Sequence, residues 1–232
     1  MILCIETATP VCSVALCDSE KVVSIRESHE NKSHASLLTV FILDILKEQN
    51  LKTSDLDAVA VSKGPGSYTG LRIGVSTAKG IAYGSGIPLI GIETTRLLFE
   101  GMKIAADFNG DVGPDIVYCP MIDARRMEVF YCLYDNNGKK IKEIEAGIIE
   151  GGSFSEISEE IKIIFSGDGS SKCREVMKRR NNVFYDDLII SAKYMHYPAI
   201  EAFKENKTED VAYFEPFYLK NFLATIPKNK IF

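Results

Sequence analysis

The first part of the chain alternates short apolar runs with longer stretches whose apolar positions recur at helical spacing. The first three runs are separated by short polar breaks, Thr7–Pro10 and Asp18–Glu20, which predicts an antiparallel meander. Strand-like and helical segments then alternate, which predicts a sheet that turns parallel and is covered on both faces. We expect strands at Ile2–Glu6, Val11–Cys17, Lys21–Glu27, Leu56–Ser62 and Pro88–Ile92, and helices at Ser33–Gln49 (with Ser33 as N-cap), Leu71–Gly84 and Thr94–Ala105.

The second part of the chain repeats this pattern more weakly. The polar, breaker-rich stretch Asp107–Pro114 marks a boundary, so we expect two domains, residues 1–106 and 107–232. A second meander follows, and then a helix alternates with a strand before further helical pattern. The expected strands are Ile116–Ile122, Glu128–Tyr134, Lys140–Ile149 and Ile163–Phe165, and the expected helix lies near Ser155–Lys162.

Composition narrows the class of protein. The chain has 232 residues, 46% of them hydrophobic, which is enough for a real core and excludes a disordered protein. A net charge of −5 argues against a free-standing nucleic-acid binder, because phosphate contacts need clustered lysine and arginine. No apolar run is long enough to span a membrane and no signal-peptide pattern begins the chain. Six cysteines without a Cys-x-x-Cys pair predict reduced, buried thiols in a cytoplasmic protein.

Two predicted helices carry more apolar or small-residue surface than a single sheet requires. In the first helix, Leu37–Leu46 is apolar around most of its circumference, with Thr39 and Asp44 as its polar residues. In the second helix, small residues recur every fourth position, at Gly70, Gly74, Ala78 and Ala82. Packing inside the domain and contact with a partner protein are about equally good explanations.

The segment Gly64–Gly70 has the position of a phosphate-binding loop, between a strand and a helix. Its glycine spacing does not match the dinucleotide fingerprint, and Leu71 and Arg72 stand where a P-loop has lysine and serine or threonine. We therefore favour a tight turn that needs close backbone approach.

Candidate polar chemistry is sparse. Glu6 and Asp123 end matching strands of the two halves, and Gly167-Asp168-Gly169 follows a strand, so these residues are weak candidates for a nucleotide site. The three histidines, His29, His34 and His196, do not have the spacing of a helical metal clamp, so we expect no metal. The basic run Lys172–Arg180 is typical of a solvated helix face, with a phosphate-binding role as the minority alternative.

Several longer motifs resemble the TsaB (YeaZ) family over nearly the whole chain. The Gly-Pro-Gly-Ser block is the most specific of them and the C-terminal piece the weakest. The motifs are Ile5–Thr9, Val61–Gly74, Ala78–Ala82, Ile122–Phe130 and Pro216–Lys220.

The resemblance implies an α/β fold of the actin/sugar-kinase/Hsp70 (ASKHA) type, built from two duplicated βββαβα-type halves. It implies a role in forming threonylcarbamoyladenosine (t6A) beside the anticodon of tRNA, as a non-catalytic paralogue and obligatory partner of the transferase TsaD. TsaD carries a metal-binding His-x-x-x-His motif, where this chain has Glu93–Leu98 without histidine. The family also usually has aspartate at the position of Glu6.

The same resemblance implies a pairing surface on the two helices discussed above. The interface candidates are Leu37, Leu38, Phe41, Gly74 and Ala78. We expect no catalytic residue and no cofactor of its own, with ATP used by the partner complex. The expected partners are a TsaD-like subunit, a TsaE-like ATPase, tRNA through the complex, and a second copy of the chain when TsaD is absent. The alternative is a small ATPase or kinase of the actin-like fold, acting through its own nucleotide site.

Overall fold

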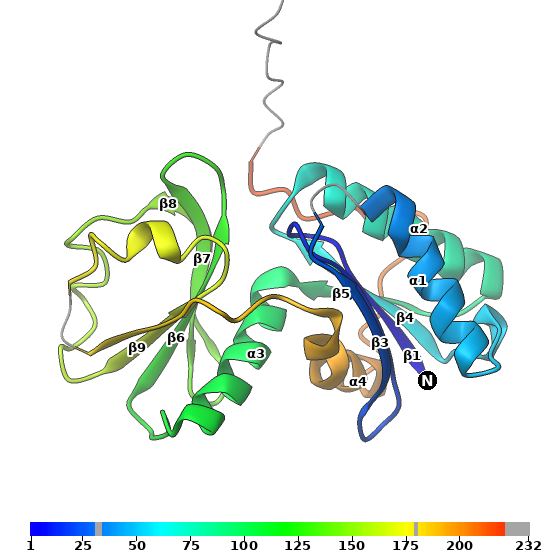
Figure 1. Ribbon diagram of the computed structural model, residues 1–232, viewed down its shortest axis with the longest axis horizontal. Helices are drawn as coiled ribbons and strands as arrows, with labels where there is room; N and C mark the ends of the chain where they lie inside the picture. The colour runs from blue at the N-terminus through cyan, green and yellow to red at the C-terminus, as the bar shows by residue number, and fades with distance from the viewer. Residues whose placement is uncertain (31–33, 179–180, 221–232) are drawn as a thin grey trace, which may run out of the picture.

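The computed structural model describes residues 1–30, 34–178 and 181–220, which form two lobes, each built on a five-stranded mixed sheet (Figure 1). The first sheet has the order β3-β2-β1-β4-β5 and the second the order β8-β7-β6-β9-β10. The strands are β1 (Ile2–Glu6), β2 (Cys12–Cys17), β3 (Val22–Ser28), β4 (Ala58–Gly64), β5 (Leu89–Glu93), β6 (Ile116–Asp123), β7 (Glu128–Asp135), β8 (Lys140–Ile148), β9 (Lys162–Ser166) and β10 (Asn182–Tyr185).

Strand direction repeats between the two sheets. In the first, β1 runs antiparallel to β2 and parallel to β4, which is parallel to β5. In the second, β6 runs antiparallel to β7 and parallel to β9, which is parallel to β10. An identical order with identical directions is the signature of a duplicated unit, so the ASKHA-like α/β fold is confirmed.

Helices cover both faces of the first sheet. One face carries α1 (His34–Glu48) and α2 (Tyr68–Ser85), which pack on β1, β2 and β4. The other face carries α3 (Thr94–Asn109), the short η3 (Ala192–Met195) and α4 (His196–Lys204). None of the helices in the described ranges is both long and apolar enough to cross a membrane.

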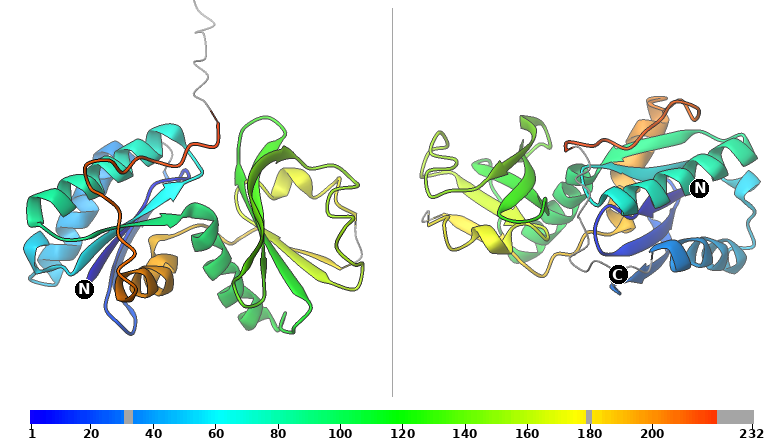
Figure 2. Two further views of the ribbon diagram at one scale, coloured as in Figure 1. Left: turned by 180° about the vertical axis from the view of Figure 1, so that it is seen from behind. Right: turned by 90° about the horizontal axis from the view of Figure 1, so that it is seen from above.

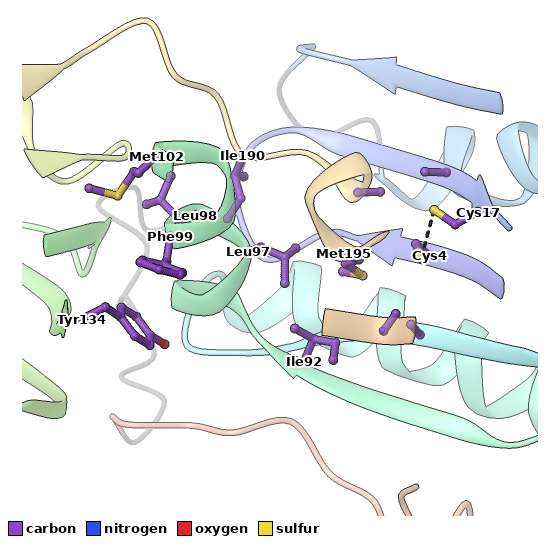
Figure 3. Packing of buried hydrophobic residues seen from close by; sticks show 14 of the residues in the cluster. Cys4, Cys17, Ile92, Leu97, Leu98, Phe99, Met102, Tyr134, Ile190 and Met195 are labelled. Carbon is purple, nitrogen blue, oxygen red and sulfur yellow. Dashed lines mark hydrogen bonds between the residues drawn. The ribbon is translucent and has the colours of Figure 1, made fainter. Parts of the chain in front are cut away.

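Helix α3 joins the two lobes through a continuous core (Figure 3). Leu97 points toward Met195 and Ile92 of the first lobe. Phe99 packs on two tyrosines of the second lobe, with ring centroids 5.3 Å from Tyr118 and 4.7 Å from Tyr134. The lobes therefore share a buried apolar contact as well as a chain connection.

The end of the described chain returns to the first lobe as an extended segment, residues 208–220, which we call the strap (Figure 2). The Glu209 amide donates to the carbonyl of Leu89 (2.8 Å), and the Phe217 amide donates to that of Lys63 (2.6 Å). The Phe214 side chain is buried in the core beneath α2. The predicted second domain, residues 107–232, thus holds the second sheet, but its η3, α4 and strap pack on the first.

Of the helical segments expected in the second half, the one near Ser155–Lys162 does not form, whereas α4 forms later in the chain. The prediction of a helix near Ser155–Lys162 is wrong, because this segment consists of turns before β9 begins. Phe154 (φ 67°) is buried there against Tyr131 and Phe165 at ring distances of 5.6 Å, and such a backbone conformation does not continue a helix. Directly after Gly169 the helical pattern gives only the short η2 (Ser171–Cys173), and a longer helix forms only at α4. A further short turn, η1 (Thr53–Asp55), lies before β4, and the predicted N-cap Ser33 lies outside the described residues.

Candidate functional site

Glu6 ends β1 in the first lobe and is completely buried. One carboxylate oxygen, Oε1, accepts a hydrogen bond from the Ala8 amide at 2.5 Å, whereas Oε2 has no partner among the described residues. Burial raises the pKa of Glu6 to about 7, and the hydrogen bond from the Ala8 amide opposes this rise. The charge of Asp168, from the second lobe, raises the Glu6 pKa further. The two lobes therefore present carboxylates that repel each other.

The glycine-rich segment before α2 packs against the turn that follows Glu6. A Cβ on Gly66 would stand 2.3 Å from the Ala8 carbonyl oxygen, and one on Gly70 would stand 2.0 Å from that of Thr7. The Ser67 amide donates to the Ala8 carbonyl at 2.7 Å. Ser67 also caps α2, its hydroxyl accepting from the Gly70 amide. Protein backbone thus occupies the close approach that the glycines allow, as the tight-turn interpretation predicts.

The second-lobe candidates Asp123, Gly167 and Gly169 are held together by short-range contacts. The Asp168 carboxylate accepts from the Asp123 amide at 2.9 Å, and the Gly169 amide donates to the Met121 carbonyl at 3.1 Å. A Cβ on Gly167 would stand 2.1 Å from the Met121 oxygen, and one on Gly169 would stand 2.9 Å from the Ile122 carbonyl carbon. Close packing on β6 is therefore sufficient to explain both glycines.

The Asp123 carboxylate is already neutralised. It contacts the ammonium of Lys172, which also donates to the carbonyls of Arg126 and Glu128. Desolvation raises the pKa of Asp168 as well. In the described part of the chain, no cluster of three histidine, cysteine, aspartate or glutamate side chains could hold a metal ion.

The basic run that begins at Lys172 is also used locally. Lys172 binds Asp123, and Arg174 forms an ion pair with Asp186 while lying over the Phe184 ring. Residues 179–180 of the run lie outside the described residues. The His34 imidazole is buried and donates to the carbonyl of Thr9 at 2.9 Å.

The structure corrects three of the interface candidates. Leu38 is 1% exposed and Ala78 is fully buried, both in the core between the helices and the first sheet. Gly74 is buried against Thr7, whose hydroxyl stands 2.2 Å from the position of a Cβ. The ridge of small residues therefore faces the chain's own sheet. Leu37 and Phe41 are only partly buried and remain candidates.

The surface left open on these helices lies at positions that sequence reasoning did not single out. On α1, Val40 and Leu43 are 44% and 66% exposed. On α2, Gly80 and Gly84 are exposed, with no atom within 4 Å of a Cβ placed on either. For α1, helical spacing could have indicated the exposed positions. Val40 and Leu43 lie on the opposite side of this helix from the buried Leu38.

Comparison with known proteins identifies the family. The family model described as TsaD, tRNA N6-adenosine threonylcarbamoyltransferase, matches residues 22–227. The protein named tRNA threonylcarbamoyladenosine biosynthesis protein TsaB from Escherichia coli K12 is 32% identical over 229 residues, which cover 96% of each chain. The protein of the same name from Bacillus subtilis 168 is 29% identical over 143 residues, 62% of this chain and 58% of that one.

The solved structure of YeaZ from Pseudomonas aeruginosa has the same fold. Its TM-score is 0.78 at 23% identity, and the match covers 94% of this chain and 99% of that one. The chain therefore belongs to the TsaB (YeaZ) family, within the broader group that the TsaD model describes.

Proposed function

We propose that this chain is a non-catalytic subunit in t6A formation, which dimerises with a TsaD-like transferase and activates it. Family membership supports the role in t6A biosynthesis. The interlobe chemistry supports the non-catalytic part: the Asp123 carboxylate is occupied by Lys172, and the Glu6 carboxylate is completely buried. For the same reasons, the proposal includes no nucleotide site in this chain.

The observation that carries the proposal is the outer surface of α1 and α2, which lie side by side on the first sheet and are left partly uncovered by the described residues (Figures 1 and 2). Leu43 and Val40 expose aliphatic surface on α1. On α2, Gly80 and Gly84 leave room for a helix of another chain to approach closely. An exposed glycine inside a helix costs about 0.5–1 kcal/mol relative to alanine, so close docking offers a reason for keeping it.

The remaining parts of the proposal concern the assembly. The chain would work in the cytoplasm without a cofactor of its own, and ATP would be used by the complex and its TsaE-like ATPase. It would meet tRNA as part of the complex. In the absence of the TsaD-like subunit, the same helical surface would support a homodimer.

Matched substitutions on one helix test the interface. Leu43→Arg places a charge on the exposed face of α1, so the chain should fold normally and lose the complex. Leu38→Arg buries a charge in the chain's own core and should prevent folding. Phe108→Arg, at a 90% exposed position at the end of α3, is the control for an added surface arginine.

The measurement is the mass of the mixture with the TsaD-like protein of the same organism, by size exclusion with light scattering. The proposal predicts a one-to-one complex, or its dimer, for the wild type and Phe108→Arg. It predicts free subunits for Leu43→Arg. A Leu43→Arg variant that still forms the complex would contradict the assignment to α1, and a wild type that forms none would contradict the partnership itself.

A further inference from the structure

The turn between β6 and β7 has an unusual backbone. Two consecutive residues, Arg125 (φ 67°) and Arg126 (φ 53°), lie in the left-handed region. Side chains with a Cβ are disfavoured there, and long ones have no local hydrogen bond to compensate. Both arginines are exposed, so packing of their side chains does not explain the conformation.

Two side chains hold this turn in place. The Asp123 carboxylate accepts from the Arg125 amide at 3.2 Å and binds the ammonium of Lys172. Lys172 also donates to the carbonyls of Arg126 (3.0 Å) and Glu128 (2.7 Å). We call these contacts of Asp123 and Lys172 the Lys172–Asp123 clamp. The clamp occupies the Asp123 carboxylate and leaves the guanidinium groups of Arg125 and Arg126 exposed to solvent. Neither has an ion-pair partner among the residues that the structure describes.

A third arginine is linked to this turn through the strap. Glu128, at the start of β7, binds Lys220 of the strap. Two residues earlier in the strap, the Tyr218 ring packs on the Tyr68 ring at a tilt of 32°, with centroids 4.7 Å apart, and its hydroxyl accepts a hydrogen bond from Arg72 at 3.3 Å. The strap therefore connects the Arg125–Arg126 turn to Arg72 at the start of α2 through one ion pair.

Charge is unbalanced along this edge. The acidic groups Asp123 and Glu128 are each paired with a lysine, whereas Arg72, Arg125 and Arg126 have no carboxylate within ion-pair distance in the described ranges. Two further carboxylates lie close by, Asp168 beside Asp123 and Glu215 near Arg72, so the surplus of positive charge along this edge lies at the Arg125–Arg126 turn. Guanidinium groups bind phosphate oxygens through paired hydrogen bonds, which makes arginine well suited to nucleic-acid recognition.

We propose that the Arg125–Arg126 turn, continued by Arg72, binds phosphate groups of the tRNA backbone. The inference rests on the proposed function, which supplies tRNA as the ligand. The strained turn presents both guanidinium groups on one fixed support, and the Lys172–Asp123 clamp prevents a neighbouring carboxylate from capturing them. The phosphates of a nucleoside triphosphate offer the same chemistry, so the test must separate the two sources.

The experiment uses the complex with the TsaD-like partner and an unmodified tRNA transcript that reads a codon beginning with A. Arg125→Gln/Arg126→Gln is compared with the control Lys139→Gln/Lys204→Gln, which removes two exposed charges elsewhere. Light scattering first establishes that each variant still forms the complex, and failure of the wild type at this step would count against the proposed function instead. Affinity for the transcript and for ATP is then measured over a range of salt concentrations.

The proposal predicts that the arginine variant binds the transcript about tenfold more weakly than the wild type. The slope of log affinity against log salt should also fall by roughly 0.7 for each phosphate group that the variant no longer binds. The lysine control should bind within about twofold of the wild type. Unchanged affinity for the transcript would overturn the proposal, and so would a weakening confined to ATP, which would assign the turn to a triphosphate.

A second variant separates binding from stability. Arg125→Asn/Arg126→Gly introduces residues that adopt positive φ readily, so the melting temperature should stay level or rise. Its affinity for the transcript should fall as in the glutamine variant. A melting temperature that falls by several degrees would overturn the claim that the arginines occupy a strained turn for binding.

Discussion

The hydroxyl of Thr7 stands 2.2 Å from the position that a Cβ on Gly74 would occupy. It donates a hydrogen bond to the Gly70 carbonyl at 2.8 Å, so it ties the turn after β1 to the first turns of α2. Thr7 is fully buried, which leaves it little room to move. The glycine at position 74 is therefore required for packing within the first lobe.

Gly74→Ala should destabilise the chain by about 1–3 kcal/mol, because the added methyl group overpacks against Thr7. Gly80→Ala on the same helix should instead stabilise the isolated chain by about 0.5–1 kcal/mol, since its Cβ would enter open space and alanine is the better helix former. Urea unfolding of both variants checks the pair. Equal effects of the two substitutions on the free energy of unfolding would contradict the placement of Gly74 on the buried face and Gly80 on the exposed face of α2.

Glu6→Gln should change how stability depends on pH. The pKa of Glu6 is raised from 4.5 to about 7 in the folded chain, so the folded state holds the proton more tightly than the unfolded state. The stability that the folded chain gains from binding this proton is fully present below pH 4.5 and is lost as pH rises through 7. Above that, the buried carboxylate costs on the order of 3 kcal/mol.

The measurement is the difference in unfolding free energy between Glu6→Gln and the wild type at pH 4.5 and at pH 8.5. The difference should move in favour of the variant by roughly 3 kcal/mol between these conditions. Other titrating groups are common to both proteins and cancel. A difference that does not vary with pH would mean that Glu6 is solvated.

Phe214→Ala should cost about 3 kcal/mol, because the ring is buried in the core of the first lobe and its removal leaves a cavity. Tyr213→Ala is the matched control, since that neighbouring ring is 84% exposed and should contribute less than about 0.5 kcal/mol. Thermal unfolding compares them. If Phe214→Ala left the stability unchanged, the strap would not be packed on the first lobe, in conflict with its hydrogen bonds to Lys63 and Leu89.

All six cysteines are free and buried, so none should react with a charged thiol reagent in the folded chain. Burial raises the pKa of the Cys12 thiol to about 11 and that of Cys132 to about 12, which further suppresses the reactive thiolate. Ellman's reagent should report no thiol at neutral pH and six in denaturant. Rapid reaction of any one thiol in the native state would contradict the burial of that side chain.

Sequence pattern predicted the first lobe well, because its strands are short apolar runs and its helices have caps and periodicity that local physics sets. The predicted and observed bounds of α3, for example, share the start at Thr94. The second lobe was harder between β8 and β9. In that segment Phe154 packs into the core from an irregular turn. The apolar positions around it therefore show neither helical nor strand periodicity.

The site was less predictable than the fold, because it depends on which side of a helix faces the sheet and on pairs far apart in the chain. Leu38 and Leu43 are both leucines on an apolar helix, yet one is buried and the other exposed. The pairing of Lys172 with Asp123 spans 49 positions and gives no local signal. The Arg125–Arg126 turn lies inside a recognised family motif, but its backbone conformation is visible only in three dimensions.

The central claim is that this chain is needed for t6A formation without performing the chemistry. Reconstituted threonylcarbamoyl transfer tests it most directly, with the TsaD-like and TsaE-like proteins, ATP, tRNA and an activated threonylcarbamoyl donor. The t6A nucleoside is quantified by mass spectrometry as this chain is added. We predict product only when both subunits are present, saturation at one chain per TsaD-like subunit, and no product with Leu43→Arg. Product formed without this chain, or formed by this chain without the TsaD-like subunit, would contradict the account.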